Sequence, residues 1–295
     1  MELKYTSVEW AKETLPKRIK DANKGSYGRL FMYVGSSAYP GAAHLALESA
    51  LRGGVGYVEF AAEGDLKSSL LSKFPETIFK SFSDAENLSS SDIERLIAEQ
   101  RRSTAILVGC GSGRSEKLFR LISELLSEDG GTLVLDADAI NSMAERREEA
   151  LSLLKNAERK VILTPHPLEF SRLSGLEIDY VNKNREAVAR EFAKENKVTL
   201  VLKGSGTVIT DGETIYVNTS GSSALAKAGS GDALAGLISS LAATRVMPCV
   251  IIGALAAFIH GRAGDNMAKI FSEYGVTPSD LPKEMAKVLA EIENS

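Results

Sequence analysis

Short apolar segments recur along the chain, and stretches long enough to form a helix separate them. Each of these segments is apolar nearly throughout, without the alternation of apolar and polar residues that marks a half-exposed strand. A strand covered by helices on both faces gives this pattern, because neither face meets water. The segments span residues 30–34, 55–61, 104–108, 132–135, 160–163 and 198–202. The pattern predicts an α/β fold in three layers, with a mostly parallel central sheet and helices on both of its faces.

A hairpin pattern follows the last of these segments. Residues 207–210 and 214–217 are β-rich and flank Asp211-Gly212, a dipeptide that favours tight turns between antiparallel strands. We therefore expect an antiparallel hairpin at one edge of the sheet.

From Asp232 onward the pattern becomes helical. One helical face collects apolar residues at the i, i+3, i+4, i+7 spacing, namely Leu234, Leu237, Ile238 and Leu241. Residues 250–268 predict a second helix that is apolar nearly all round and therefore buried, and Pro248 precedes it, where a helix start tolerates proline. Residues 279–292 predict a closing helix, with Ser279-Asp280 as its candidate cap.

The length and composition fit one globular domain. The chain has 295 residues, 44% of them hydrophobic and 25% charged, which excludes disordered and fibrous classes. The chain shows no internal repeat of 20–50 residues and no linker rich in Pro, Gly or Ser. We expect a single domain over residues 1–295, in which residues 1–23 form an N-terminal extension that packs on the rest.

The charge balance and the cysteines exclude several classes of partner. There are 35 basic and 39 acidic residues, a net charge of −4, and no basic run that could follow a phosphate backbone, so we expect no nucleic-acid partner. Cys110 and Cys249 show no CxxC spacing, which argues against a disulfide scaffold and a cysteine metal site. The first residues lack the apolar core of a signal peptide, and the longest apolar stretch, residues 250–259, is too short to span a bilayer. These features predict a soluble cytoplasmic protein with no membrane partner.

The most informative segment for chemistry is the glycine-rich turn of residues 228–231, which leads directly into a helix. The N-terminus of a helix binds anions through its free N–H groups and its dipole, and glycines let a phosphate approach the backbone. A carboxylate there is also stabilised, so we expect Asp232 to be ionised at neutral pH and available as a base. The alternative is that Asp232 only caps the helix and that the glycines only form a turn.

A second candidate anion site lies between two β-rich segments, at residues 203–207. Two glycines and a hydroxyl at a sheet edge leave backbone N–H groups available for a nucleotide phosphate, and Lys203 can neutralise its charge. An ordinary turn would look similar. Together, the two glycine-rich segments could hold opposite ends of a polyphosphate.

Other strand ends carry glycines or polar residues. His166 stands between Pro165 and Pro167 at the end of a strand, and a stiff backbone in such a place favours a functional role. His44 and His260 lie within helical apolar patterns and are interpreted as structural. Residues 109–113 do not have the spacing of a dinucleotide-binding fingerprint, and the chain has no Walker A motif, so nucleotide binding here needs another kind of fold.

Taken in order, the loops form a specific set. They are Lys24-Gly25-Ser26-Tyr27-Gly28, Tyr39-Pro40-Gly41-Ala42-Ala43, Leu135-Asp136-Ala137-Asp138-Ala139-Ile140-Asn141, Leu163-Thr164-Pro165-His166-Pro167-Leu168-Glu169-Phe170, Val201-Leu202-Lys203-Gly204-Ser205-Gly206-Thr207 and Ala226-Lys227-Ala228-Gly229-Ser230-Gly231-Asp232. This set resembles the ADP/ATP-dependent NAD(P)H-hydrate dehydratases over nearly the whole chain. The resemblance implies a ribokinase-like fold and a lyase that repairs hydrated NADH and NADPH, with ADP or ATP as phosphoryl donor and Mg²⁺ as cofactor. It also implies a separate NAD(P)HX epimerase in the same pathway, because the chain has no room for a fused one, and a homo-oligomer, a tetramer in the family.

The resemblance assigns site residues one by one. The nucleotide site falls on Lys203, Gly204, Ser205, Gly206, Thr207 and Gly231, and the hydrated-nicotinamide site falls on Ala42, Gly111, His166 and Asp232. No set of metal ligands is evident. Two positions depart from the family's pattern, since Ser222 replaces the usual amide and Ala228 replaces the usual first glycine of the turn.

The mechanism implied has two stages. Asp232 accepts the proton of the substrate hydroxyl as its oxygen attacks the terminal phosphoryl group of the nucleotide, and the ring nitrogen then expels phosphate. Two alternatives stay open on the sequence: a small-molecule kinase of the same fold that keeps its phosphorylated product, acting on a vitamin precursor or a sugar, and a nucleotide-binding sensor with weak catalysis.

Overall fold

The computed structural model describes residues 3–82 and 89–294. The strands are β1 (Lys4–Tyr5), β2 (Arg29–Tyr33), β3 (Tyr57–Glu63), β4 (Ile78–Phe82), β5 (Ala105–Val108), β6 (Thr132–Leu135), β7 (Val161–Leu163), β8 (Thr199–Leu202), β9 (Val208–Thr210) and β10 (Ile215–Val217). The helices are α1 (Val8–Thr14), α2 (Pro40–Arg52), α3 (Gly64–Leu71), α4 (Ser90–Gln100), α5 (Glu116–Ser127), α6 (Asp138–Glu145), α7 (Arg147–Asn156), α8 (Pro167–Ser174), α9 (Ile178–Lys183), α10 (Arg185–Asn196), α11 (Ser230–Ala243), α12 (Cys249–Gly275) and α13 (Leu281–Asn294).

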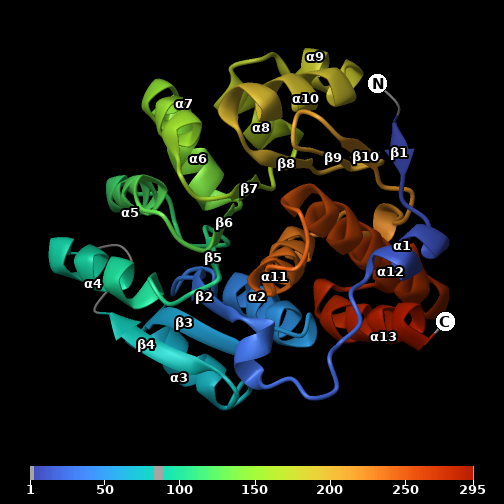
Figure 1. Ribbon diagram of the computed structural model, residues 1–295, viewed down its shortest axis with the longest axis horizontal. Helices are drawn as coiled ribbons and strands as arrows, with labels where there is room; N and C mark the ends of the chain where they lie inside the picture. The colour runs from blue at the N-terminus through green and yellow to red at the C-terminus, as the bar shows by residue number, and fades with distance from the viewer. Residues whose placement is uncertain (1–2, 83–88, 295) are drawn as a thin grey trace.

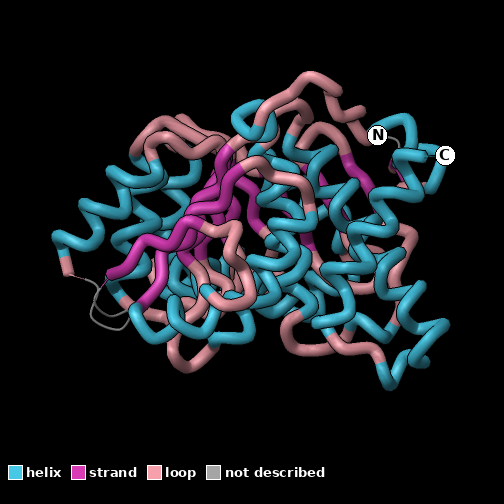
Figure 2. Tube along the Cα trace, turned by 90° about the horizontal axis from the view of Figure 1, so that it is seen from below, coloured by secondary structure: helices cyan, strands magenta, loops and turns pink. Residues whose placement is uncertain are grey.

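One sheet runs through the centre of the molecule, as Figures 1 and 2 show. Its strand order is β1-β10-β9-β8-β7-β6-β5-β2-β3-β4, and its pairs are parallel except where β9 meets β8 and β10. The predicted α/β class and the antiparallel hairpin are therefore confirmed. All eight strands expected from the sequence form, with ends that differ by at most two residues.

Two strands were not expected. β4 lies at one edge beside β3, and β1 lies at the other edge, parallel to β10, so the hairpin is the second and third strand from that edge. β1 has only two residues, Lys4 and Tyr5, which pair with Tyr216 and Val217. Just beyond it, the Thr6 hydroxyl donates to Asn218 Oδ1 at 3.1 Å.

Helices cover both faces of the sheet, and each face has its own apolar core. On one face, α2, α11, α12 and α13 pack together, and on the other lie α4, α5, α6, α7, α8 and α10 (Figure 1). The strand side chains point alternately into the two cores, as Leu107 and Val108 of β5 illustrate. This arrangement explains why the strands are apolar throughout.

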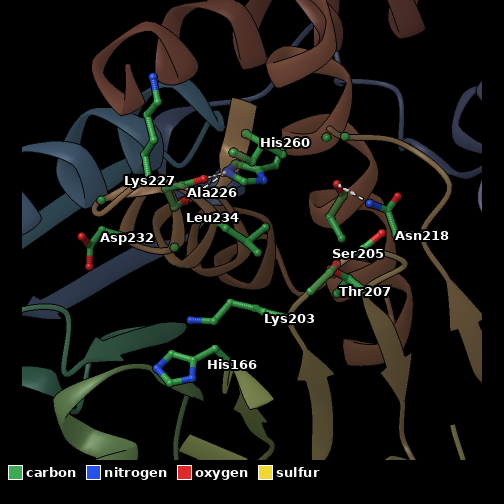
Figure 3. A pocket seen from close by; sticks show the side chains of 18 of the residues that line it. His166, Lys203, Ser205, Thr207, Asn218, Ala226, Lys227, Asp232, Leu234 and His260 are labelled. Carbon is green, nitrogen blue, oxygen red and sulfur yellow. Dashed lines mark hydrogen bonds between the residues drawn. The ribbon is translucent and has the colours of Figure 1, made fainter. Parts of the chain in front are cut away.

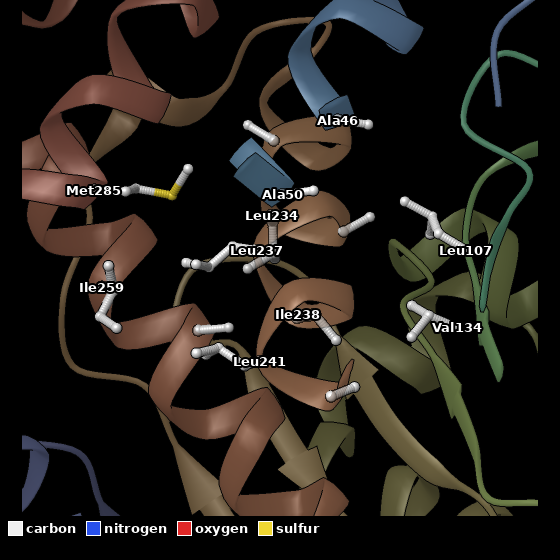
Figure 4. Packing of buried hydrophobic residues seen from close by; sticks show 14 of the residues in the cluster. Ala46, Ala50, Leu107, Val134, Leu234, Leu237, Ile238, Leu241, Ile259 and Met285 are labelled. Carbon is white, nitrogen blue, oxygen red and sulfur yellow. The ribbon is translucent and has the colours of Figure 1, made fainter. Parts of the chain in front are cut away.

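α11 is buried over nearly its whole length. Leu234, Leu237 and Leu241 face α12, and Ile238 lies on the side of β5 and β6 (Figure 4). Against α2 the contact is backbone to backbone, because a Cβ on Gly236 would lie 2.2 Å from the Ala46 carbonyl oxygen. This packing fixes the N-terminal end of α11 in space.

The C-terminal helices differ in detail from the prediction. α12 continues to Gly275, with one non-helical residue at Ser272 (φ 60°, ψ 165°). The expected cap at Ser279-Asp280 is wrong. Thr277 instead caps a short 3-10 turn, Pro278–Asp280, in which the Asp280 carboxylate accepts from the Thr277 N–H at 2.7 Å, and α13 begins at Leu281. Among residues 3–82 and 89–294, no helix combines the length and the apolar character needed to cross a membrane.

Candidate functional site

A cavity of about 690 Å³ opens at the carboxyl ends of β6, β7 and β8. The N-terminus of α11 and the side of α12 close it from the other direction (Figure 3). Its lining includes residues 203–207, 218, 220–223 and 225–232, together with Asp136, Ala137, His166, Glu169 and His260. Both glycine-rich segments singled out in the sequence therefore lie in one cavity.

α11 starts at this cavity without a side-chain cap. Its N-cap residue is Gly229, with φ at +101°, and no side chain accepts a hydrogen bond from the first turn. A helix end in this state offers N–H donors and a positive partial charge to an anion. Asp232 forms no capping hydrogen bond, so the interpretation that it merely caps the helix has no support in the structure.

The charge state of Asp232 differs from the expectation. Burial, and next the charge of Asp136, raise the pKa of Asp232 from 3.8 to about 7, against the opposing effects of Lys203 and Cys110. The helix dipole favours the ionised form but is outweighed, since a dipole contributes less than the removal of a carboxylate from water. The expectation that Asp232 is fully ionised at neutral pH is therefore wrong, and the group is instead suited to accept and release a proton near neutrality.

Asp136 and Lys203 form a buried ion pair beside Asp232. The Lys203 amine lies 2.7 Å from Asp136 Oδ1, and the Thr164 hydroxyl donates to the same oxygen at 2.6 Å. Burial alone lowers the pKa of Lys203, but Asp136 and Glu169 outweigh it and the net shift is upward. Lys203 therefore stays positively charged, and its amine lies 3.2 Å from the point where a Cβ on Gly231 would stand.

The loop of residues 203–207 connects β8 to β9. Arg185 holds the start of this loop by donating to the carbonyl oxygens of Leu202 (2.9 Å) and Lys203 (3.1 Å). Further on, the Thr207 hydroxyl donates to the Gly204 carbonyl at 3.0 Å, and Gly206 has φ at +63°, a conformation that glycine adopts without strain. Gly204, Ser205 and Gly206 all line the cavity.

His166 lines the cavity and also caps α8. Its Nδ1 accepts from the N–H groups of Leu168 and Glu169, each at 3.2 Å, so the proton of a neutral ring is on Nε2, which lies 3.2 Å from Glu169 Oε1. Burial, followed by Lys203, lowers the pKa of His166, which favours this neutral form. The sequence pointed to a functional place for His166, but the capping role was not expected.

Ala42 and Gly111 are neighbours, and neither is part of the cavity lining. Gly111 has φ at +62°, and a Cβ on it would stand 2.8 Å from the Cβ atoms of both Ala42 and Tyr39. The neighbouring Cys110 reaches the cavity acids, with its Sγ 3.4 Å from Asp136 Oδ2. The four residues assigned to the hydrated nicotinamide thus fall into two groups: Asp232 and His166 line the cavity, whereas Ala42 and Gly111 are neighbours outside its lining.

Ala137 has a strained backbone in the cavity wall. Its φ is 48° and its ψ is −111°, between Asp136 and the start of α6. A residue with a Cβ adopts such a conformation only where the surrounding structure enforces it, and such strain is concentrated at functional sites.

The sequence missed the roles of three residues at this cavity. Asp136 and Glu169 were visible only as strand-end acids, and their pairing with Lys203 could not be read from spacing. His260 is buried and lines the cavity, where its Nε2 lies 3.0 Å from the carbonyl oxygen of Ser230, the first residue of α11. Burial lowers the pKa of His260 to about 4, so the ring is neutral. A histidine in an apolar helix gave no sequence signal for this place.

The two positions that depart from the family's pattern also line the cavity. The hydroxyl of Ser222 is buried and has no hydrogen-bond partner within the described residues. Ala228 follows Lys227, whose amine donates to the carbonyl oxygens of Tyr274, at 2.7 Å, and Val276. The turn before α11 is therefore tied to the end of α12.

One cluster in residues 3–82 and 89–294 has the geometry of a metal site. Its potential ligand atoms, from Cys110, Asp136 and Asp232, all lie within 4.8 Å of one another. Mg²⁺ prefers hard oxygen ligands, whereas a thiol is soft, and Asp136 already accepts from Lys203 and Thr164 through Oδ1 and from Cys110 through Oδ2. This donor set does not fit a magnesium ion.

Comparison with known proteins finds similarity to enzymes named for the repair of hydrated NAD(P)H. A family model for NAD(P)H-hydrate dehydratase matches residues 30–287. The bifunctional NAD(P)H-hydrate repair enzyme Nnr of Moorella thermoacetica is 33% identical over 291 residues, which cover 97% of this chain and 54% of that enzyme. The ADP-dependent (S)-NAD(P)H-hydrate dehydratase of Neisseria meningitidis serogroup B is 35% identical over 251 residues, 84% of this chain and 80% of that enzyme. The chain thus spans about half the length of the bifunctional relatives that it matches.

Solved structures give the same picture of the fold. The ADP/ATP-dependent NAD(P)H-hydrate dehydratase of Bacillus subtilis, co-crystallised with ATP and Mg²⁺, superimposes with a TM-score of 0.85 at 27% identity and covers 99% of this chain and 100% of that one. A ribokinase-like superfamily protein of Enterococcus faecalis superimposes with a TM-score of 0.83 at 24% identity, over 99% and 97% of the two chains. The predicted ribokinase-like fold is confirmed.

Proposed function

The chain belongs to the NAD(P)H-hydrate dehydratase family, and on that premise we propose that it dehydrates hydrated NADH and NADPH, using ADP or ATP as phosphoryl donor. The observation that carries the proposal is the position of Asp232. It is a carboxylate with a pKa of about 7 at the uncapped N-terminus of α11, with the charged amine of Lys203 nearby. A base suited to neutral pH thus stands next to a site for a transferring phosphoryl group.

The reaction follows from this juxtaposition. Asp232 accepts the proton of the substrate's ring hydroxyl while the hydroxyl oxygen forms a bond to the terminal phosphorus, and the bond from that phosphorus to the rest of the nucleotide breaks. The N–H groups of the first turn of α11 stabilise the charge on the transferring group. The lone pair of the ring nitrogen then expels phosphate and forms a C=N⁺ double bond. Loss of a proton from the adjacent ring carbon to water or to the released phosphate converts this into the ring C=C and the neutral nitrogen, which restores the dihydronicotinamide.

The nucleotide is assigned to the loop of residues 203–207 and to Gly231. Residues 203–207 line the same cavity as the α11 terminus, so this loop and the helix start would bind the two ends of a diphosphate or triphosphate. The Neisseria relative is named for ADP and the Bacillus structure for ADP and ATP, and both nucleotides remain candidate donors here.

The hydrated nicotinamide is assigned to Ala42, Gly111, His166 and Asp232. In support, His166 and Asp232 line the cavity, and Cys110 connects it to the place where Ala42 and Gly111 meet. His166 is neutral and half exposed, so its ring can contact a substrate without carrying charge.

We further propose that magnesium accompanies the nucleotide, as it does in the Bacillus crystals. Because the cluster of Cys110, Asp136 and Asp232 does not fit this ion, its ligands would come from phosphates and water, as is common for magnesium. No step of the reaction above is assigned to it.

The wider setting is also part of the proposal. We take residues 1–295 as one domain with residues 1–23 packed on it, supported by the pairing of β1 with β10 and by contacts of α1 with α12 and α13. We place the enzyme in the cytoplasm as a homo-oligomer, a tetramer by family resemblance, and the exposed apolar side chains of Ile270, Phe271 and Tyr274 at the end of α12 support assembly. We also propose that an NAD(P)HX epimerase acts in the same pathway, since the repair enzymes that this chain matches over about half of their length are bifunctional.

One assay tests the proposal. Purified protein is incubated with hydrated NADH or hydrated NADPH and with ADP or ATP, and both nicotinamide absorbance and released phosphate are followed. Recovery of the absorbance together with an equal amount of phosphate supports the dehydratase. A stable phosphoester without recovery would indicate a small-molecule kinase, and nucleotide binding without any turnover would indicate a sensor.

A further inference from the structure

Cys110 stands between the two carboxylates of the cavity. It lies in the loop after β5 and is fully buried, and its Sγ is 3.4 Å from Asp136 Oδ2. The thiol and one oxygen each of Asp136 and Asp232 all lie within 4.8 Å of one another. The carboxylates come from the end of β6 and the first turn of α11, so the thiol connects two elements that are far apart in the sequence.

The hydrogen bonds of Asp136 explain why the thiol matters. Oδ1 of Asp136 already accepts from the Lys203 amine and the Thr164 hydroxyl, whereas Oδ2 accepts from Cys110. Burial, and next the charges of Asp136 and Asp232, raise the pKa of the Cys110 thiol well above its ordinary value. Cys110 therefore keeps its proton and acts as a neutral donor with a single S–H group.

We propose that Cys110 is a positioning residue that sets the proton affinity of Asp232. Its S–H group donates to Asp136 while Asp232 is protonated, and it turns to Asp232 once that carboxylate has lost its proton. This inference rests on the proposed function, since it concerns the base of that reaction.

The other groups around Asp232 make Cys110 the informative one to change. Asp136 at the end of β6 and Asp138 at the start of α6 raise the pKa of Asp232, whereas Lys203 after β8 and Cys110 after β5 lower it. Replacing Asp136, Asp138 or Lys203 changes the net charge of the cavity. Replacing Cys110 removes only a hydrogen-bond donor and leaves every charge in place.

The first experiment compares Cys110→Ala and Cys110→Ser by the pH dependence of kcat. In Cys110→Ala, ionised Asp232 loses a hydrogen-bond donor, so its pKa rises. We expect the acid limb of the kcat–pH profile, where kcat rises with pH, to shift to higher pH by roughly 0.5–1 unit, which lowers kcat at a given pH on that limb by about 3–10-fold. A serine hydroxyl is a stronger donor than a thiol, so Cys110→Ser is expected to keep the limb in place or lower it. Cys249→Ala removes the chain's other thiol, outside the cavity lining, and is the matched control.

The thermal midpoint separates positioning from packing. If Cys110 only filled space, Cys110→Ala would lower the midpoint and leave the limb where it is in the wild type. The proposal would therefore be overturned if the acid limb of the kcat–pH profile lay at the same pH in the wild type, Cys110→Ala and Cys110→Ser, whatever their thermal midpoints are.

The second experiment needs no substrate. In Cys249→Ala, Cys110 carries the only S–H group, whose infrared stretching band shifts when its acceptor changes. We expect this band to shift with pH as Asp232 titrates and to lose that shift when Asp232→Asn is added. If the wild type fails to convert hydrated NADH or NADPH back into NADH or NADPH, the proposed function is wrong. The infrared band still shows whether the Cys110 thiol responds to the titration of Asp232. A band that does not respond to pH overturns the inference.

Discussion

Replacing Asp232 by Asn separates its catalytic role from its effect on stability. The two side chains have nearly the same shape, and the change removes a base from the start of α11. The expected loss of turnover is roughly 10²–10⁴-fold, the usual contribution of a positioned general base, with nucleotide affinity little changed. In the wild type, kcat should rise with pH to a plateau, with a midpoint near the Asp232 pKa of about 7, because the base acts in its ionised form.

The same substitution should stabilise the folded protein. The pKa of Asp232 is raised in the folded state from 3.8 to about 7, so the folded chain holds a proton that the unfolded chain releases. A raised pKa gives stability that is fully present below pH 3.8 and is lost as the pH rises to about 7. At about 1.4 kcal/mol for each of roughly three pH units, the wild type loses up to about 4 kcal/mol over this window. Asparagine does not titrate, so the variant avoids this loss.

Calorimetry near pH 5 and near pH 8 measures the difference. An unfolding entropy of roughly 2 cal/mol/K per residue makes 4 kcal/mol about 7 °C for a chain of 295 residues. The variant should melt above the wild type at pH 8, and its advantage should grow by roughly 3–5 °C between pH 5 and pH 8. Near-normal turnover in the variant would show that Asp232 is not the base. If the variant melts at or below the temperature of the wild type at pH 8, ionisation of the buried Asp232 carboxyl does not destabilise the folded protein.

Three further substitutions test other parts of the site. Gly206→Val places a Cβ on a residue with φ at +63° in the nucleotide loop, so calorimetry should find ADP and ATP affinity weakened by about tenfold or more, while the hydrated dinucleotide still binds; unaltered nucleotide affinity would remove the loop from the site. His166→Ala should lower kcat/KM for the hydrate by roughly 10–150-fold through KM, with the KM for the nucleotide nearly constant, and should lower the thermal midpoint because the α8 cap is lost. His166→Asn, which keeps a capping acceptor, should recover the midpoint but not the KM; equal losses for both ligands would mean that His166 is only structural. Ala137→Gly should raise the free energy of unfolding in urea by about 1 kcal/mol by relieving the strain at φ 48°, and an unchanged value would show that this backbone is not strained.

The fold was predictable because its strands are buried on both faces. In such strands the apolar run marks the element itself, as residues 132–135 show by matching β6. β4 escaped because it lies at the sheet edge and contains Lys80 and Ser81 within a short segment. β1 escaped because its two exposed residues have no pattern of their own and form a strand only by pairing with β10.

The site was predictable in its glycines and not in its electrostatics. Glycine-rich turns next to a strand or a helix have a local cause, so the segments at Gly206 and Gly231 could be recognised from spacing. The pKa of Asp232 depends on Asp136 and Lys203, which reach it from other strands, and on burial that only the packed fold creates. For this reason the sequence pointed to Asp232 as an acid at the start of a helix but assigned it the wrong charge.

The pairing of β1 with β10 sets an order of events during synthesis. Thr6 and Asn218, which are hydrogen-bonded to each other, are 212 residues apart, and Asn218 lines the cavity. At the usual 5–20 residues per second, a ribosome makes the second residue roughly 10–40 s after the first. The N-terminal segment must therefore wait, unpaired, while β2 to β8 are made and can assemble. Residues 4–6 are thus made long before their partners and are among the last of residues 4–218 to take their place, and when they dock they secure Asn218 at the wall of the cavity.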